Sequence, residues 1–247
     1  MGETAWKVEV LLTGSWRGAS SVLLSHGRLH VVVDTGLPHE AHLLLDALQQ
    51  KGFLPSDIRI VINTHYHVDH VLNNNLFPSS LIYGPQESYE WCRALYSDLS
   101  HESEWKTRVL KYYPEILEYE RAEENMGKLR RLTLRWWDVS RLGSPAQFRW
   151  TENQPLPEGL QSLFTHGHVP GHMSLLVPGG EQRTVIAGDA LLTRDHDAQV
   201  LTMIPHNRKQ FHLDRALILS LSGRIIPGHD HEFLLAENGA VESLPPS

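Results

Sequence analysis

The sequence predicts an α/β fold, an αββα sandwich in which two mixed β-sheets pack together and helices flank their outer faces. Two observations lead to this prediction. Strand-like segments alternate with helix-like segments in both halves of the chain, and side chains able to bind metals follow directly after several predicted strands. A doubly wound sheet is the alternative architecture for the same order of elements.

The N-terminal part begins with short apolar runs that are separated by Gly and Ser. Over residues 7–34 these runs predict a β-meander. Leucines at helical spacing predict a helix over 38–52, which ends at Gly52. Apolar runs at 58–63 and 80–84 predict two further strands, and the first of them leads directly into a group of histidines.

Residues 86–150 differ in composition from the rest of the chain and predict a helical insertion, interrupted near Pro114. The segment is unusually aromatic. Such side chains line apolar pockets and dimer interfaces, although packing among helices is the default. The sequence leaves open whether the insertion is a lid or an interface, and a homodimer is one expectation. Among its aromatic side chains are Tyr89, Trp91, Tyr96, Trp105, Tyr112, Tyr113, Trp136 and Trp137.

The C-terminal part again reads as strands followed by a helix and a strand. Apolar runs at 160–166, 173–180 and 183–189 predict three strands. A helix is predicted over 209–221, and a last strand over 224–228.

Length and composition limit the class of protein. With 247 residues, 41% of them hydrophobic, the chain can form one substantial core, and we expect a single domain over 1–247. The formal net charge of -7 argues against nucleic acid as a partner. No stretch approaches the roughly 20 apolar residues that span a bilayer, so no membrane association is expected. The single cysteine, Cys92, is expected to be a partly buried helical thiol and fits a reducing compartment, so we expect a cytoplasmic protein.

The stretch INTHYHVDH carries four side chains that can bind metals. His65 and His67 lie two apart at the end of a predicted strand, so their side chains project to the same side and can share one ion. Asp69 and His70 follow after the chain turns, which directs them to a neighbouring position. The pattern predicts two adjacent metal sites. Imidazole and carboxylate suit Zn²⁺, with Fe, Mn and Co as alternatives.

Three later segments carry more such residues, each where a predicted strand stops. THGHVPGH supplies His166, His168 and His172, AGDA supplies Asp189, and IIPGHD supplies His229. We expect these segments to meet at one edge of the sheets. Ligands from separate segments come together only on folding, so metal binding should also stabilise the fold.

These motifs together resemble the metallo-β-lactamase superfamily. The resemblance rests on HxHxDH at 65–70, HxPGH at 168–172, GD at 188–189 and PGH at 227–229, in the order found in that family. It extends over about 8–231, and the helical insertion is its weakest part.

The resemblance implies a role for each residue of the motifs. The ligands that it implies for two zinc ions are His65, His67 and His168 at the first ion, Asp69, His70 and His229 at the second, and Asp189 between them. Iron or manganese are alternatives to zinc. Asp34 is implied to hydrogen-bond the metal-binding loop, and His172 to support the loop that carries His168. His166 has no assigned role.

The resemblance also implies an activity. A metal-bridging hydroxide would attack a carbonyl or phosphoryl centre, while Asp69 orients it and passes its proton to the leaving group. We therefore expect a dinuclear metal-dependent hydrolase whose small-molecule substrate is an ester, a thioester or a lactone. The alternatives are a phosphodiesterase or nuclease-type hydrolase, an iron-dependent dioxygenase, and a non-catalytic binding protein that is stabilised by metal.

Within the superfamily, the chain is similar to lactonases and to compact animal metallo-β-lactamase domain proteins. It shares LFP at 76–78 with the animal proteins. It shares HxHxDH, a bridging aspartate and a terminal GHD with homoserine-lactone lactonases, but has Leu192 where they carry a tyrosine. Tyr66 or a tyrosine of the helical insertion would have to substitute. The bridging Asp189 argues against a true β-lactamase, because those members of the family lack this residue.

Three cationic side chains close to the motifs are candidates for substrate binding. Arg194 follows the GD motif, and Arg208 and Lys209 begin the predicted C-terminal helix. Such side chains recognise a substrate carboxylate or phosphate, although solvated surface charge is the commoner role.

Overall fold

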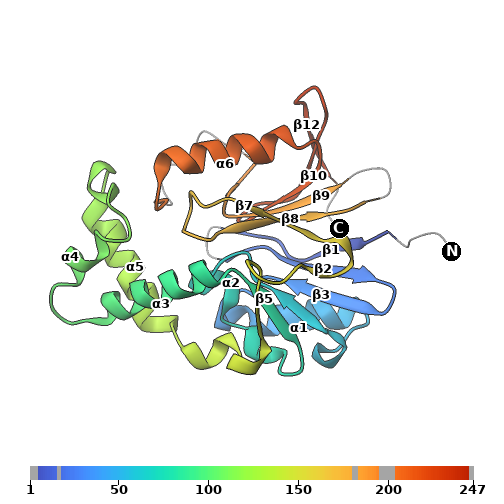
Figure 1. Ribbon diagram of the computed structural model, residues 1–247, viewed down its shortest axis with the longest axis horizontal. Helices are drawn as coiled ribbons and strands as arrows, with labels where there is room; N and C mark the ends of the chain where they lie inside the picture. Colours follow the sequence, from blue (N-terminus) through green and yellow to red (C-terminus); the bar gives the residue numbers. More distant parts are fainter. Residues whose placement is uncertain (1–4, 16–17, 180–182, 195–203, 245–247) are drawn as a thin grey trace.

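Two six-stranded β-sheets form the centre of the molecule, and helices lie outside them (Figure 1). The computed structural model describes residues 5–15, 18–179, 183–194 and 204–244. Both sheets contain parallel as well as antiparallel strand pairs. The predicted αββα sandwich of two mixed sheets is therefore confirmed, and the single doubly wound sheet is not what the chain forms.

The first sheet is built from the N-terminal half of the chain. Its strands, in the order in which they pair, are β1 (Lys7–Leu12), β2 (Ser21–His26), β3 (Leu29–Val33), β4 (Ile60–Ile62), β5 (Leu81–Gly84) and β6 (Phe148–Trp150). The first three strands are antiparallel, whereas β3 to β6 are parallel. Parallel strands end at the same edge of a sheet, so the residues that follow β3 and β4 are neighbours there.

The second sheet is built from the C-terminal half. Its strands, in pairing order, are β12 (Val241–Ser243), β11 (Phe233–Leu235), β10 (Gly223–Pro227), β9 (Thr184–Gly188), β8 (Met173–Val177) and β7 (Gln161–Phe164). Only the central pair, β9 and β10, is parallel among these described strands. The residues after both of these strands therefore lie at one edge.

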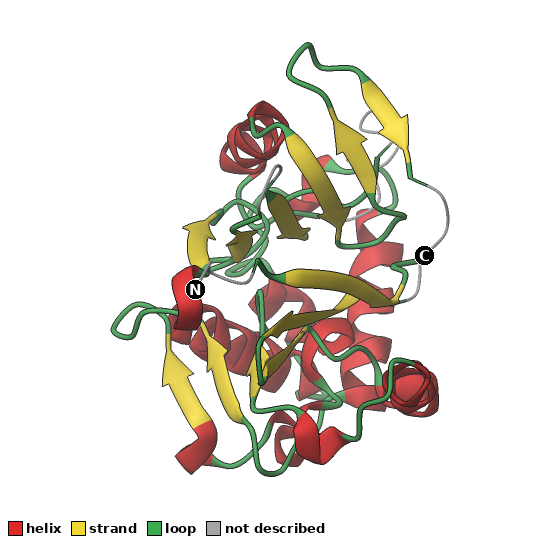
Figure 2. Cartoon of the chain, turned by 90° about the vertical axis from the view of Figure 1, so that its right-hand side faces the viewer, coloured by secondary structure: helices red, strands yellow, loops and turns green. Residues whose placement is uncertain are grey.

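The helices lie outside the two sheets. They are α1 (Ala41–Gln50), α2 (Val68–Val71), α3 (Gln86–Ser100), α4 (Trp105–Val109), α5 (Ala122–Trp136) and α6 (Arg208–Ser220). Of these, α1 and α6 lie on the outer faces, and α3, α4 and α5 lie at one end (Figure 1). Short 3-10 turns are η1 (Pro38–Glu40), η2 (Pro55–Asp57), η3 (Asn74–Leu76), η4 (Ile116–Glu118), η5 (Val139–Leu142), η6 (Pro145–Gln147) and η7 (Pro157–Gly159). Figures 1 and 2 show α6 beside the second sheet. None of the described helices is long and apolar enough to cross a bilayer.

Alternation along β3 divides its apolar side chains between two cores. Val31 and Val33 belong to the core between the sheets, which also contains Ile186 of the second sheet. Val32 points to the opposite face and joins the core under α1, with Leu44. The period of two along a strand is the physical reason for this division.

The helical insertion packs on the segment that carries the histidines. Helices α3, α4 and α5 lie at one end of the sandwich (Figure 1), and their core includes Val68 and Val71 of α2. The eight aromatic side chains named from the sequence are all buried in this core or packed against it, so helix packing accounts for them. Cys92 is fully buried there, more than predicted, and burial raises the pKa of its thiol.

The observed elements differ from the predicted ones at β6, at the end of β8, and at two strands that were not predicted. Residues 148–150, the end of the predicted helical insertion, form β6, because they extend the first sheet beside β5. The strands β11 and β12 were not predicted, since each has three residues and, unlike β4, lies outside a longer apolar run. The predicted strand over 173–180 ends at Val177, and residue 180 lies outside the described residues.

Candidate metal centre

The candidate ligands follow the ends of strands from both sheets. After β4 the chain passes through Thr64 to His65 and His67. In the second sheet, Asp189 follows β9 directly, and His229 lies two residues after its parallel neighbour β10. The strand order thus brings together residues that are far apart in the sequence.

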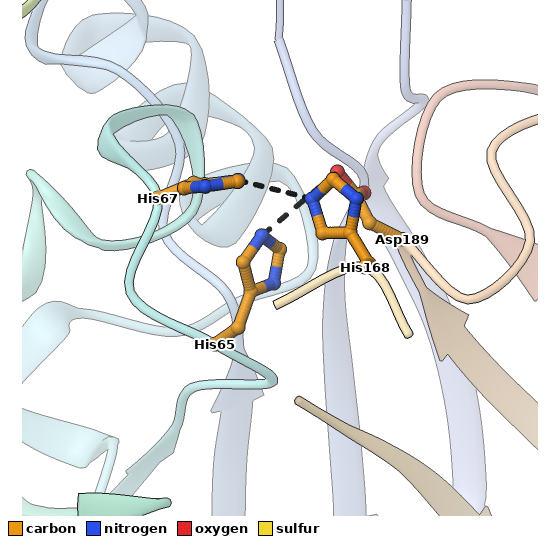
Figure 3. A group of neighbouring side chains, drawn as sticks. All are labelled: His65, His67, His168 and Asp189. Atoms are coloured by element: carbon orange, nitrogen blue, oxygen red, sulfur yellow. Dashed lines mark hydrogen bonds and ion pairs between the residues drawn. The ribbon is translucent and has the colours of Figure 1, made fainter. Parts of the chain in front are cut away.

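These residues form two groups, and in each group one ligand atom per residue lies within 4.8 Å of the others. The first group, shown in Figure 3, contains His65, His67, His168 and Asp189. The second group contains Asp69, His70 and His229. The structure thus brings together all seven side chains for which the sequence predicts a ligand role.

Asp189 faces both groups, with a different carboxylate oxygen toward each. Its Oδ2 lies 3.1 Å from Nε2 of His168 and 3.8 Å from Nε2 of His65. Its Oδ1 lies 3.2 Å from Nε2 of His70 and 3.3 Å from Nε2 of His229. A carboxylate divided in this way can bind one cation with each oxygen.

Glycine is required beside this carboxylate. A Cβ atom on Gly228, the glycine of the PGH motif, would collide with Oδ1 of Asp189. Gly188 of the GD motif has a φ of +51°, and its Cβ would lie 2.9 Å from Nε2 of His172. The two glycines therefore let the chain pass close to the candidate metal site.

The two histidines of the second group are oriented through their outer nitrogens. Nδ1 of His70 donates to Oδ2 of Asp34 at 2.8 Å, and Nδ1 of His229 donates to the backbone carbonyl of Ser15 at 2.8 Å. A neutral imidazole that donates from Nδ1 keeps a free lone pair on Nε2. Both Nε2 atoms face Asp189, so they are presented as ligand atoms.

Asp34 also holds the loop of the first group. Its Oδ1 accepts the backbone N–H of Thr64 at 2.9 Å, and its Oδ2 accepts the hydroxyl of Thr64 at 2.8 Å. Because this hydroxyl donates to Asp34, it accepts from Nδ1 of His65, 3.1 Å away, and leaves Nε2 of His65 facing the cluster. The backbone of Asp34 has a φ of +52°, a left-handed conformation that Asp tolerates better than most residues.

Buried atoms in the centre make no hydrogen bond within the described part of the chain. They include Nε2 of His65, His70 and His229, and Oδ1 of Asp189. Unpaired buried polar atoms are rare and costly. Imidazole nitrogens and a carboxylate that face one another at these distances are stabilised by cations, and this donor set fits a dimetal site.

The charges of the cluster influence one another strongly. Burial raises the pKa of Asp189, but neighbouring imidazoles, above all that of His229, hold it well below its usual range. Burial lowers the pKa of His229, but the carboxylates of Asp189 and Asp69 raise it to about 9. In the first group, burial and neighbouring imidazoles keep the pKa values of His65 and His67 well below the ordinary value. A bound cation takes the place of the proton in such a site.

His172 supports the backbone that carries Asp189. Its Nε2 accepts the backbone N–H of Asp189 at 3.0 Å, so its Nδ1 carries the proton and donates to Oγ1 of Thr165 at 2.8 Å. That hydroxyl donates to Oγ of Ser174 at 3.2 Å, which donates to the carbonyl of Ala187 at 2.8 Å. The chain of donors and acceptors is complete, which satisfies each buried group.

Helix α6 holds the loop that carries His168. The backbone N–H of Gly167 donates to Oδ2 of Asp214 at 2.6 Å, and the carbonyl of Gly167 accepts the N–H of Asn207 at 3.0 Å. The carbonyl of His168 accepts the N–H of His206 at 2.8 Å. A side chain on Gly167 would collide with the backbone of α6, so this close approach requires glycine.

The three predicted substrate-binding cations have different surroundings. The guanidinium of Arg208 lies 5.2 Å from the ring centroid of Tyr119 in the helical insertion, and Lys209 is exposed. Arg194 is half-buried, and its backbone N–H donates to Oδ2 of Asp230 at 2.8 Å. A role in substrate binding stays a prediction for all three.

The two proposed sources of a tyrosine near the site lie in different places. Tyr66 is fully buried, and its hydroxyl lies 2.6 Å from where a Cβ on Gly84 would be. Tyr113 of the helical insertion lies at the cluster, where its hydroxyl is 3.3 Å from Nε2 of His67.

Some residues that orient the cluster were not predicted to do so. Thr64 directly precedes HxHxDH, and Thr165 begins the stretch THGHVPGH, so a hydroxyl beside each group of histidines is a local signal that could have indicated them. Ser15 acts through its backbone carbonyl, and Tyr113 comes from a distant helical segment. No local pattern marks either of these two.

Comparison with known proteins agrees with this fold and this arrangement of residues. The family model described as the metallo-beta-lactamase superfamily matches residues 14–229. The chain belongs to the metallo-β-lactamase superfamily. The resemblance identified from the sequence motifs is thereby confirmed, and the protein is a metal-dependent hydrolase of this superfamily.

Relatives in the metallo-β-lactamase superfamily match most of the chain. Metallo-beta-lactamase domain-containing protein 1 of Xenopus laevis is 30% identical over 222 residues, which are 90% of this chain and 75% of that protein. The solved structure of AidC, a dizinc quorum-quenching lactonase, has a TM-score of 0.58 at 18% identity and covers 99% of this chain and 92% of its own. An N-acyl homoserine lactone hydrolase has a TM-score of 0.57 at 18% identity, with 93% and 94% covered. At these identities the two structures show a shared fold.

Proposed function

We propose that this chain is a dinuclear zinc hydrolase that cleaves a small ester, thioester or lactone. The observation that carries the proposal is the division of the Asp189 carboxylate, with Oδ2 toward His168 and Oδ1 toward His70 and His229. Two adjacent cations joined by one carboxylate suit the hydrolysis of an acyl bond.

The seven side chains of the two groups would hold the ions in the arrangement that the motifs imply. Asp189 would serve both ions, and the other ligands would be His65, His67 and His168 at one, and Asp69, His70 and His229 at the other. Two bound zinc ions would lower the pKa of a shared water and polarise the substrate oxygen. Asp34 and His172 would keep the ligands in place through the hydrogen bonds described above.

Asp69 is the member of the cluster best placed to move a proton. Its side chain is 20% exposed, whereas that of Asp189 is 2% exposed. Its Oδ2 lies 3.5 Å from Nε2 of His229, at the edge of the second group. A carboxylate that reaches both the cluster and the solvent side can accept a proton from the attacking water at Oδ2 and deliver it to the leaving group.

The surroundings of the cluster support an acyl substrate. The ring of Trp91 lies 6.3 Å from that of His67, and Tyr113 contacts the same histidine, so this side of the first group is aromatic. Aromatic walls suit an acyl chain or a small ring better than a phosphate backbone. The two lactone hydrolases of the same fold support the same substrate class for this chain.

The second group argues against the oxygenase alternative. An iron-dependent dioxygenase needs one metal ion, for which the first group would be sufficient. Asp69, His70 and His229 then would have no function, although their ligand atoms converge as closely as those of the first group. A hydrolase that uses two ions accounts for both groups.

Metal content tests the dinuclear site. Untagged protein should contain about two zinc ions per chain by inductively coupled plasma mass spectrometry, as a two-metal hydrolase requires. His70→Ala should lose metal, whereas His212→Ala, which removes an exposed histidine of α6, should not. A single iron or no metal in the wild-type protein would overturn the proposal.

An activity panel tests the substrate class. The zinc-loaded protein should hydrolyse members of a set of small esters, thioesters and lactones, and Asp69→Asn should lower kcat because it cannot accept the proton. Turnover of bis-phosphate esters without any acyl hydrolysis would show that the phosphodiesterase alternative is correct instead.

A further inference from the structure

Tyr113 connects the helical insertion to the first group. Its hydroxyl lies 3.3 Å from Nε2 of His67, 46 residues away in the sequence. The side chain is 3% exposed, and His67 is the hydrogen-bond partner of this hydroxyl within the described part of the chain. A buried hydroxyl on a candidate ligand is the outer-shell contact that determines which imidazole nitrogen faces a metal.

The position of Tyr113 is well defined by its own surroundings. Its backbone N–H donates to the carbonyl of Val109 at the end of α4, at 3.1 Å, and its carbonyl accepts the N–H of Ile116 at 3.1 Å. Its ring packs edge-on against Trp91, with 5.5 Å between centroids, and belongs to the core of the insertion. The backbone hydrogen bonds and the packing of the ring therefore hold the hydroxyl in place.

The two nitrogens of His67 face different partners. Nδ1 lies 3.0 Å from Nε2 of His168, inside the first group, whereas Nε2 faces Tyr113. When Nδ1 binds a cation, the ring proton must be on Nε2, since neutral imidazole carries one proton. That N–H then donates to the oxygen of Tyr113.

We propose that Tyr113 is a positioning residue that makes Nδ1 of His67 the ligand atom, and that the helical insertion thereby contributes to metal affinity at the first group. The inference rests on the proposed ligand role of His67. Without the hydroxyl, the N–H at Nε2 of the half-buried His67 loses the acceptor that it has within the described residues, which disfavours the tautomer that binds the cation.

Tyr113→Phe tests this inference, and Tyr112→Phe, a change of the preceding residue, is the matched control. Tyr112→Phe removes a hydroxyl that donates to Oδ2 of Asp98, at 2.8 Å, within the same insertion. Zinc affinities are measured for the full-length protein by competition with a chromophoric chelator. Tyr113→Phe should lower the affinity for one of the two ions by about 10- to 100-fold, the usual effect of a change in a residue that contacts a metal ligand. Tyr112→Phe should leave both affinities unchanged.

Two further measurements separate positioning from a general structural effect. Substituting Co²⁺ for zinc should give an altered visible absorption spectrum in Tyr113→Phe and the wild-type spectrum in Tyr112→Phe. In the background of His67→Ala, adding Tyr113→Phe should cause no further loss of affinity, because the two side chains act through one contact. Equal thermal unfolding of the metal-free Tyr113→Phe and wild-type proteins checks the fold.

Specific outcomes would overturn the inference. Unchanged zinc affinities and an unchanged Co²⁺ spectrum in Tyr113→Phe would show that the hydroxyl does not position His67. An additive loss in the double variant would show that Tyr113 acts through the fold. Failure of the proposed function is seen separately, as a wild-type protein that does not bind two ions or does not cleave acyl substrates.

Discussion

The two groups of the candidate metal centre differ in what holds their histidines. In the second group, the outer nitrogens donate to a buried carboxylate, Asp34, and to the backbone carbonyl of Ser15. In the first group, the partners are the neutral hydroxyls of Thr64 and Tyr113, and Nδ1 of His168 makes no hydrogen bond within the described residues. Because a carboxylate acceptor raises the basicity of an imidazole ligand, we expect tighter binding at the second group.

The difference follows from where the partners come from. Asp34 follows β3, and Ser15 lies between β1 and β2, so the partners of the second group lie in loops that flank strands of the first sheet. Tyr113 belongs to the helical insertion. The comparison teaches that the outer hydrogen-bond partners of the second group's histidines come from the sandwich, whereas one outer partner of the first group comes from the inserted helices.

The largest expected effect comes from Asp189→Asn, which removes the residue that the two groups share. Its charge faces four histidines, so both zinc affinities should fall by more than about 100-fold, beyond the effect of an outer-shell change. Zinc titration followed by mass spectrometry measures the loss. Asp46→Asn on the exposed face of α1 is the control. Retention of one tight ion would show that the two groups do not share this ligand.

Asp34→Asn sharpens the comparison, since it should lower the metal affinity of the second group more than that of the first. The amide nitrogen would face the N–H of His70, and asparagine tolerates the left-handed backbone as aspartate does. We expect a loss of about 10- to 100-fold in affinity for one ion. We also expect a loss of about 1–3 kcal/mol in the free energy of unfolding, from unpaired buried donors. Chelator competition and urea unfolding measure the two effects. Equal weakening of both ions would contradict the distinction between the groups.

Without metals, the two groups should respond to pH in opposite directions. The pKa of His229 is raised to about 9, so its contribution to stability is complete below about 6.5 and is lost as pH rises through about 9. The pKa of His65 is lowered, so its contribution is present above 6.5 and is lost as pH falls below this value. The free energy of unfolding of chelator-treated protein should therefore be greatest near pH 6.5.

Urea unfolding of the chelator-treated protein across this pH range measures the profile. His229→Gln should flatten the alkaline side and leave the acid side as it is. A wild-type profile that stays level between pH 6.5 and 9 would count against the contribution assigned to His229.

The smallest expected effect is that of Arg208→Ala, because Arg208 belongs to neither group of candidate ligands. Its cation packs over the ring of Tyr119, a contact worth about 0.5–1 kcal/mol. Urea unfolding should show a loss within this range, and mass spectrometry should show unchanged zinc content. If the predicted substrate role is correct, KM for an anionic substrate should rise while kcat stays the same. A loss of zinc would show that this face of α6 is coupled to the metal centre.

Much of the fold could be predicted because its signals are local. The meander over 7–34 and the helix that ends at Gly52 follow from the spacing of apolar residues and from turn residues. The strands β6, β11 and β12 could not be predicted in the same way. A strand of three residues that lies outside a longer apolar run, unlike β4, carries too little periodicity, and only its pairing with a neighbour in the sheet makes it a strand.

The sequence by itself determined which side chains can bind metals, the superfamily to which they belong, and their place after the ends of strands. Only the tertiary structure decided which atoms face one another. The division of the two oxygens of Asp189 depends on two parallel strands of the second sheet and on α2 of the opposite half. The contact of Tyr113 with His67 depends on the packing of the insertion. Spacing along a chain defines local geometry, whereas distances between remote residues arise only when the cores that join them are formed.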